Sequence, residues 1–458
     1  MHLSKTSCLL RDLLVLYFRT KILSVIRSIR STEPQKTNDD VESTKGTEPP
    51  TSPRTTYLDG LVHMFRATVG TGILALPVAF SQLGYVGGII GVVFILFISN
   101  YCAVILVDCQ RELTKRNKDM IPSYQGTVQA AFASGPKAVR SLAPIFVTST
   151  NIFILLGQIG GLCVYIVFIA SNIKAAVYPH WDMDLRYFEL IIFIPILAIN
   201  MVLNLKKLSM VSTFGNAILL TSVAVVLYYI FREPISMEGK HAFGSINDIP
   251  QFFGTVFFAS CCITMVLPLQ NEMKREDQLV GNCGVLNVSA YLYGTLYVAF
   301  GLLGYLKYDD KSAGSITLNL PPGERLAQAV QLLLALSVLT ATAIHNYIGV
   351  SIIWDDYVDK RLTKHRLLAQ YLIRISTLTI TLLVSLLVPN LELLLSVTGV
   401  LGQCTLSTTI PCIVHMLTYY EQPSFWAYVR KFWIDAIALI ITVIVLIFGL
   451  ASALFNDA

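Results

Sequence analysis

An unusual set of polar residues lies in and just before the apolar stretch at residues 61–80, LVHMFRATVGTGILALPVAF. Asp59, His63, Arg66 and Gly70 are separated by four, three and four residues, so on a helix they form one stripe. Ionisable groups in an apolar segment usually face a protein interior or a water-filled cavity, and an imidazole changes its charge near neutral pH. The stripe leaves two readings open: His63 and Arg66 pair or reach the surface near the cytoplasmic helix end, or His63 has a function that depends on its change of charge.

The triplet Gly70-Thr71-Gly72 follows on the same helix, and Pro77 comes soon after it. Glycine inside a membrane helix often serves only for close packing. A glycine-rich segment before a proline can also unwind, and its freed N–H groups could then bind a carboxylate. The stretch therefore indicates a broken helix with a candidate anion-binding backbone.

A second broken helix would be expected at the corresponding position of the other half of the chain, because transporters built from inverted repeats pair such helices. The stretch 252–274 carries Ser260, Cys261, Cys262 and Thr264 near its middle. These side chains are small and polar, but the cluster lacks a glycine. The pattern alone leaves this second break open.

Helices that cross a membrane must position these residues, because 54% of the 458 residues are hydrophobic and only 14% are charged. Apolar runs of about 18 residues or more recur, each long enough to cross a hydrocarbon core as a helix. Eleven such runs are predicted, near 58–82, 85–108, 143–176, 187–203, 209–231, 251–270, 283–306, 326–352, 369–388, 391–417 and 434–454.

Composition and charge also predict the roles of the two ends of the chain and the classes of partner. Residues 1–56 are predicted to form a mostly disordered cytoplasmic tail, residues 57–454 the membrane domain and residues 455–458 a short outer tail. The net charge of +5 reflects basic cytoplasmic loops rather than a nucleic-acid partner. We find no phosphate-binding loop, no metal-ligand spacing and no catalytic group, so we expect no cofactor, no metal and no enzyme.

The sequence resembles the proton-coupled amino acid transporter family, within the amino acid and auxin permease group. The resemblance covers nearly all of residues 56–454. The motifs that carry it are HMFRATVGTGILALP in the first run, CVYIVFIASNI in the third, FFGT and MVLPLQNEMK in the sixth, and GSITLNLP between the seventh and eighth.

The resemblance implies an all-α membrane protein of eleven transmembrane helices, with a LeuT-type inverted repeat of five plus five helices and one extra helix. It implies proton-coupled symport of a small neutral amino acid across the plasma membrane or an endosomal or lysosomal membrane. His63 would be the proton-coupling group. The implied substrate-binding residues are Thr68, Val69, Gly70, Thr71, Gly72, Tyr165, Ser260, Cys261 and Thr264.

The sequence departs from the family where function is most sensitive. Family members commonly carry Phe-Glu-Gly in the sixth span, where this chain has Ser260-Cys261-Cys262, and an Asn where this chain has Thr68. One alternative is therefore an amino acid sensor that transports little and engages a cytoplasmic protein partner through its tail; another is a channel. Tyr165 and His345 are either pocket residues or packing residues.

Overall fold

The computed structural model describes residues 55–117, 121, 123–178, 183–203, 205–232, 234–359, 365–421 and 424–455. In these residues the regular structure is helical apart from one isolated bridge between Thr55 and Met273. Arg54–Ala458 forms one compact unit. The predicted tail lies outside the described residues except for Thr55 and Thr56, and so do residues 456–458 of the predicted outer end.

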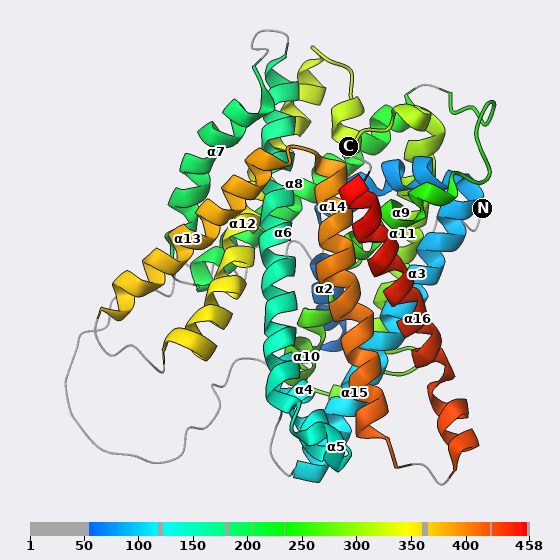
Figure 1. Cartoon of the computed structure of the whole chain (residues 1–458). Helices are drawn as coiled ribbons and strands as arrows, with labels where there is room; N and C mark the ends of the chain where they lie inside the picture. The colour runs from blue at the N-terminus through cyan, green and yellow to red at the C-terminus, as the bar shows by residue number, and fades with distance from the viewer. Residues whose placement is uncertain are drawn as a thin grey trace. The chain divides into compact units, whose positions relative to one another are not determined.

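The helices follow one another along the chain as shown in Figure 1. Their bounds are α2 (Tyr57–Thr68), η1 (Thr71–Ala75), α3 (Leu76–Asn117), α4 (Tyr124–Ser134), α5 (Lys137–Arg140), α6 (Ala143–Val177), α7 (Leu185–Asn200), α8 (Leu205–Phe231), η2 (Ile246–Asp248), α9 (Ile249–Ala259), α10 (Ile263–Glu272), η3 (Glu276–Gln278), α11 (Val285–Tyr308), η4 (Asp309–Lys311), η5 (Ile316–Asn319), α12 (Arg325–Ile353), η6 (Trp354–Val358), α13 (Arg366–Leu387), α14 (Leu391–Thr398), η7 (Gly399–Thr409), α15 (Ile410–Thr418) and α16 (Phe425–Phe455).

Among the described residues, nine helical stretches are long and apolar enough to cross a membrane. One of them, Thr71–Asn117, contains a kink at Gly84, whose φ of 78° and ψ of 174° are not helical. The helix α7, at 16 residues, is shorter than these nine stretches. The multi-pass helical membrane fold is thus confirmed, and the number eleven stays a prediction.

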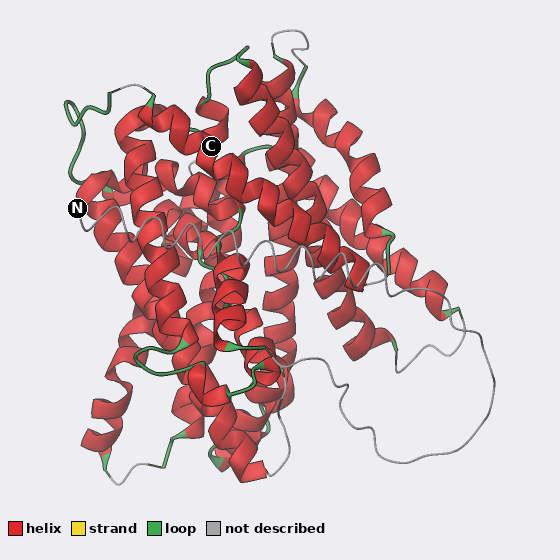
Figure 2. Cartoon of the chain, turned by 180° about the vertical axis from the view of Figure 1, so that it is seen from behind, coloured by secondary structure: helices red, strands yellow, loops and turns green. Residues whose placement is uncertain are grey.

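Two groups of helices make up the bundle. In Figure 1, α6 stands in the middle of the view, with α7, α12 and α13 to its left and α3, α9, α11 and α16 to its right. The contacts agree, since α6 packs on α7, α12 and α13, and α3 packs on α9 and α11. Figure 2 shows the same helices from behind, joined by loops at their ends. Buried apolar residues from both groups meet in one large core, and two further clusters include residues of α3 and α16.

The tenth apolar run is continuous but changes its winding: α14 passes into η7, an 11-residue π-helix, and then into α15. Here it crosses α9 at very short range. A Cβ on Gly399 would lie 1.8 Å from the carbonyl oxygen of Gly254, and a Cβ on Gly254 would lie 2.3 Å from that of Ser396. Only glycine allows two backbones to approach so closely.

Candidate functional site

The first break interrupts the helix where the sequence predicts it. α2 ends at Thr68, and Gly70 is extended with φ −114° and ψ −153° before η1 begins at Thr71. The N–H groups of Thr71 and Gly72 open this new helix, where no preceding turn offers them a carbonyl. The Gly-Thr-Gly segment therefore presents backbone donors at the positive end of a helix.

The second break also exists, although it lacks a glycine. α9 ends at Ala259 and α10 begins at Ile263, with Ser260 at φ −94° and Cys262 at φ −136° between them. Both φ values are negative, so ordinary L-residues adopt this backbone without strain. The missing glycine is therefore no obstacle to the break.

The two breaks lie against each other in the core. A Cβ added to Gly72 would lie 2.5 Å from the Cα atom of Ala259. The hydroxyl of Tyr297, on α11, lies 2.8 Å from the carbonyl oxygen of Thr68 and 2.7 Å from that of Ala259. The ends of α2 and α9 thus meet at one side chain.

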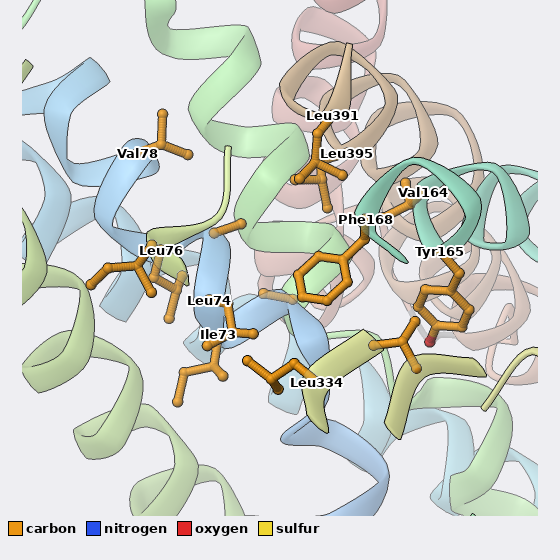
Figure 3. Close-up of a cluster of buried hydrophobic side chains, with 14 of the residues drawn as sticks. Ile73, Leu74, Leu76, Val78, Val164, Tyr165, Phe168, Leu334, Leu391 and Leu395 are labelled. Carbon is orange, nitrogen blue, oxygen red and sulfur yellow. The ribbon is translucent and has the colours of Figure 1, made fainter. Parts of the chain in front are cut away.

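The third apolar run supplies an aromatic wall beside the first break. Tyr165 and Phe168 of α6 share a buried cluster with Ile73 and Leu74 of η1, as Figure 3 shows. The Tyr165 hydroxyl lies 3.0 Å from Nε2 of His345 on α12, and the two rings meet edge to face. Thr71 also interacts with the Tyr165 hydroxyl. The predicted residues Thr71 and Tyr165 are therefore neighbours.

The second break contacts the tenth run directly, and a glutamine of the tenth run connects it to the third run. The thiol of Cys261 meets the side-chain oxygen of Gln403 on η7. The amide of Gln403 in turn lies against Gly157 of α6, where a Cβ would be 3.2 Å from its nitrogen. Ser260 is buried, and its hydroxyl donates to the carbonyl of Phe257 at 3.3 Å. Cys261 is thus tied to the neighbouring helices.

A small cavity adjoins the second break on the side of α2, α3 and α11. Its volume of about 10 Å³ is close to the minimum that holds one water molecule. Within the described part of the chain, the buried hydroxyls of Ser99 and Ser407 have no hydrogen-bond partner, and both line this cavity. The remaining lining residues are Met64, Asn100, Ala103, Ser260, Cys262, Ile263, Leu286, Ser289 and Tyr293. Such a lining suits water or another small polar occupant.

The structure places His63 apart from the breaks. His63 is exposed on α2, whereas Met64 and Thr68 of the same helix are buried. Arg66, one turn further on, donates to the hydroxyl of Thr213 on α8 at 3.2 Å. The predicted stripe is therefore the exposed and half-exposed face of α2. Thr264, the last predicted substrate-binding residue, is half-buried at the start of α10.

Sequence reasoning missed a buried polar cluster at the last helix. Asp435 on α16 is fully buried, and its carboxylate accepts a hydrogen bond from the hydroxyl of Tyr101 at 2.9 Å. Nδ1 of His415 on α15 lies 2.7 Å from its other oxygen. The signal for this cluster was present, because Asp435 is an acid inside an apolar run and needs a partner there. For Tyr297 the sequence offers no signal, since aromatic residues are common in such runs.

The sequence and the fold of the chain are similar to those of known proteins. Residues 53–455 match the family described as transmembrane amino acid transporter protein. The chain is 30% identical over 403 residues to "Proton-coupled amino acid transporter-like protein pathetic" of Drosophila melanogaster, covering 87% of this chain and 85% of the relative. It is 27% identical over 391 residues to "Amino acid transporter AVT3C" of Arabidopsis thaliana, covering 81% and 85%. Among solved structures it is similar to "Inward facing conformation of Mhp1", with a TM-score of 0.52 and 14% identity, over 91% of this chain and 94% of that one.

Proposed function

Because the chain belongs to the transmembrane amino acid transporter family, we propose that it moves small neutral amino acids together with protons by alternating access. Amino acid transport is the activity of the family, and the chain is a multi-pass membrane protein rather than an enzyme. The helical fold is that of a LeuT-type transporter. We propose three things beyond this: the coupling to protons, the preference for small neutral amino acids, and the residues that bind the proton and the amino acid.

The observation that carries the substrate site is the meeting of the two breaks. At the first, the N–H groups of Thr71 and Gly72 stand at the positive end of a helix and would receive the substrate carboxylate. At the second, α9 ends at Ala259, and this C-terminal helix end carries the opposite partial charge and would attract the substrate ammonium group. A zwitterion carries the two charges that these two helix ends would attract.

The preference for a neutral side chain follows from the residues around the breaks. Thr68, Val69 and Gly70 on one side, together with Tyr165, Ser260, Cys261 and Thr264, carry no charge at neutral pH. A substrate with a charged side chain would bring a third charge into this apolar surrounding without a partner, which is costly. A small neutral amino acid brings none.

His63 is the proposed proton carrier. It is exposed on α2 and lies five residues before Thr68, where the broken helix ends. Asp59 and Arg66 sit about one turn to either side, so charge on this face changes when His63 binds a proton. Movement of α2 would then couple the proton to the substrate, whether the membrane is the plasma membrane or that of an endosome or lysosome.

The test is uptake of a panel of labelled amino acids into proteoliposomes, with and without an inward proton gradient. Accumulation of a small neutral amino acid that needs the gradient would support the proposal. Saturable binding without uptake would instead favour a sensor, and uptake that ignores the gradient would remove the proton from the mechanism.

The assignment of His63 needs its own variant. His63→Ala should lose gradient-driven accumulation while keeping exchange of internal for external substrate. The control is His365→Asn, since His365 is an exposed histidine with φ 59°, a conformation that asparagine also tolerates. If His63→Ala accumulated substrate as well as this control, with the same pH dependence, His63 would not be the coupling group.

A further inference from the structure

Tyr297 joins the two broken helices through a single hydroxyl group. The side chain is fully buried on α11. Its oxygen lies 2.8 Å from the carbonyl oxygen of Thr68, the last residue of α2, and 2.7 Å from that of Ala259, the last residue of α9. Both distances are those of normal O–H···O hydrogen bonds.

The two carbonyl groups need a positive group between them. Each stands at the C-terminal end of a half-helix, where the helix dipole concentrates partial negative charge. Two such ends that face each other repel, and a bound cation commonly sits at half-helix ends in transporters with broken helices. Here the phenolic hydrogen of Tyr297 occupies that place.

A phenol has one hydrogen and two carbonyl groups compete for it. The hydroxyl either shares the hydrogen between Thr68 and Ala259 or rotates from one to the other. Either way the donor stays between the helix ends when α2 and α9 shift by a small distance. The Tyr297 side chain can thus offset the negative partial charge of both helix ends throughout the transport cycle. A soluble cation would have to bind again in each cycle to do the same.

We propose that Tyr297 is a positioning residue that substitutes for a bound cation between the two breaks and thereby holds the substrate-binding backbone in place. The proposal rests on the substrate site proposed above and adds that this site needs no Na⁺. Its effect reaches substrate through neighbouring backbone: Gly70 donates its N–H to the carbonyl of Thr68 at 2.9 Å, so displacement of Thr68 displaces the first break.

The experiment measures exchange of external labelled L-alanine, or of whichever panel member the wild type accumulates, for the same unlabelled amino acid inside proteoliposomes. Both sides have equal pH, so the result does not depend on proton coupling, and failure of the coupling proposal leaves it unaffected. The wild type should show the same KM in sodium chloride and in choline chloride.

Tyr297→Phe removes only the hydroxyl, so the carbonyl of Ala259 loses this donor and that of Thr68 keeps only the N–H of Gly70. We expect KM to rise by about tenfold, the effect of one lost buried hydrogen bond, with Vmax within about threefold of the wild type. A folding defect would instead reduce the number of active carriers and lower Vmax at an unchanged KM.

The matched control is Tyr305→Phe on the same helix. Tyr305 is also fully buried, and its hydroxyl accepts a hydrogen bond from the N–H of His241 at 3.2 Å, away from the breaks. Its KM should stay within about twofold of the wild type. A KM for Tyr297→Phe no higher than that of Tyr305→Phe, or a wild type that binds substrate more tightly in Na⁺ than in choline, would overturn the proposal.

Discussion

Replacement of Gly72 by alanine should force the two breaks apart. The added methyl group would lie 2.5 Å from the Cα atom of Ala259 and 2.8 Å from its Cβ atom, and real Cβ atoms do not approach closer than 3.0 Å. Because the obstacle includes backbone, it cannot rotate away. Gly72 does not have the positive φ that disfavours alanine, so the backbone conformation itself tolerates the change.

The size of the effect follows from the cost of overpacking, about 1–3 kcal/mol. If this cost falls on the arrangement that binds substrate, affinity drops by about 5-fold to 150-fold. We expect the KM for exchange of the labelled amino acid to rise within this range. The assay is the same equal-pH exchange in proteoliposomes, with the amount of protein in the membrane measured for each variant.

Gly60→Ala is the control for this substitution. Gly60 lies on α2, is buried, and would place its Cβ at 3.7 Å from the nearest atom, which is ordinary contact. This variant should keep its KM within about twofold of the wild type. If Gly72→Ala behaved like Gly60→Ala, the close contact between Gly72 and Ala259 would not limit substrate binding, and the argument for adjacent breaks would fail.

Two further predictions concern ionisable groups away from the breaks. Asp435→Leu leaves Tyr101 and His415 without their buried acceptor and should destabilise the protein by about 3–5 kcal/mol, as measured by thermal unfolding of purified protein. The double replacement of Asp435 and His415 by leucine should recover much of this loss. An equally unstable double variant would contradict the pairing. Glu324→Gln should leave the pH profile of uptake unchanged between about pH 5 and 7. The hydrogen bond from Arg232 holds the pKa of Glu324 below its ordinary value of 4.5, so the carboxylate stays charged in this range and the ion pair is lost only when pH falls through the lowered pKa. A profile that differs from the wild type between these pH values would refute this prediction.

The sequence predicts the first break well and the second poorly, for a physical reason. Gly70-Thr71-Gly72 changes the local backbone preference, and such a change is visible in a single segment. The break at Ser260 and Cys262 uses backbone angles open to any residue, so its cause lies in the surroundings. Tyr297 and Gln403 contact this break from distant parts of the chain, and no local pattern reports such contacts.

The sequence also could not predict which side chains are exposed. The spacing of Asp59, His63 and Arg66 places them on one face of a helix, as the structure has them, but spacing cannot say what covers that face. By contrast, Tyr165 and His345 could each be read as pocket or packing residues, and their 3.0 Å contact makes them partners. Which side chains meet is decided by the packing of α6 on α12, far apart in the chain.

The crossing of α9 and η7 at Gly254 and Gly399 has a mechanical consequence. Side chains that interlock resist sliding, and α11 packs on α3 with the ring of Phe80 between them. At Gly254 and Gly399 backbone lies directly against backbone, so no side chain has to move aside at this point when one helix turns on the other. We therefore expect any rotation of the first half of the sixth run to occur about this crossing, with the break at Ser260 moving at its far end.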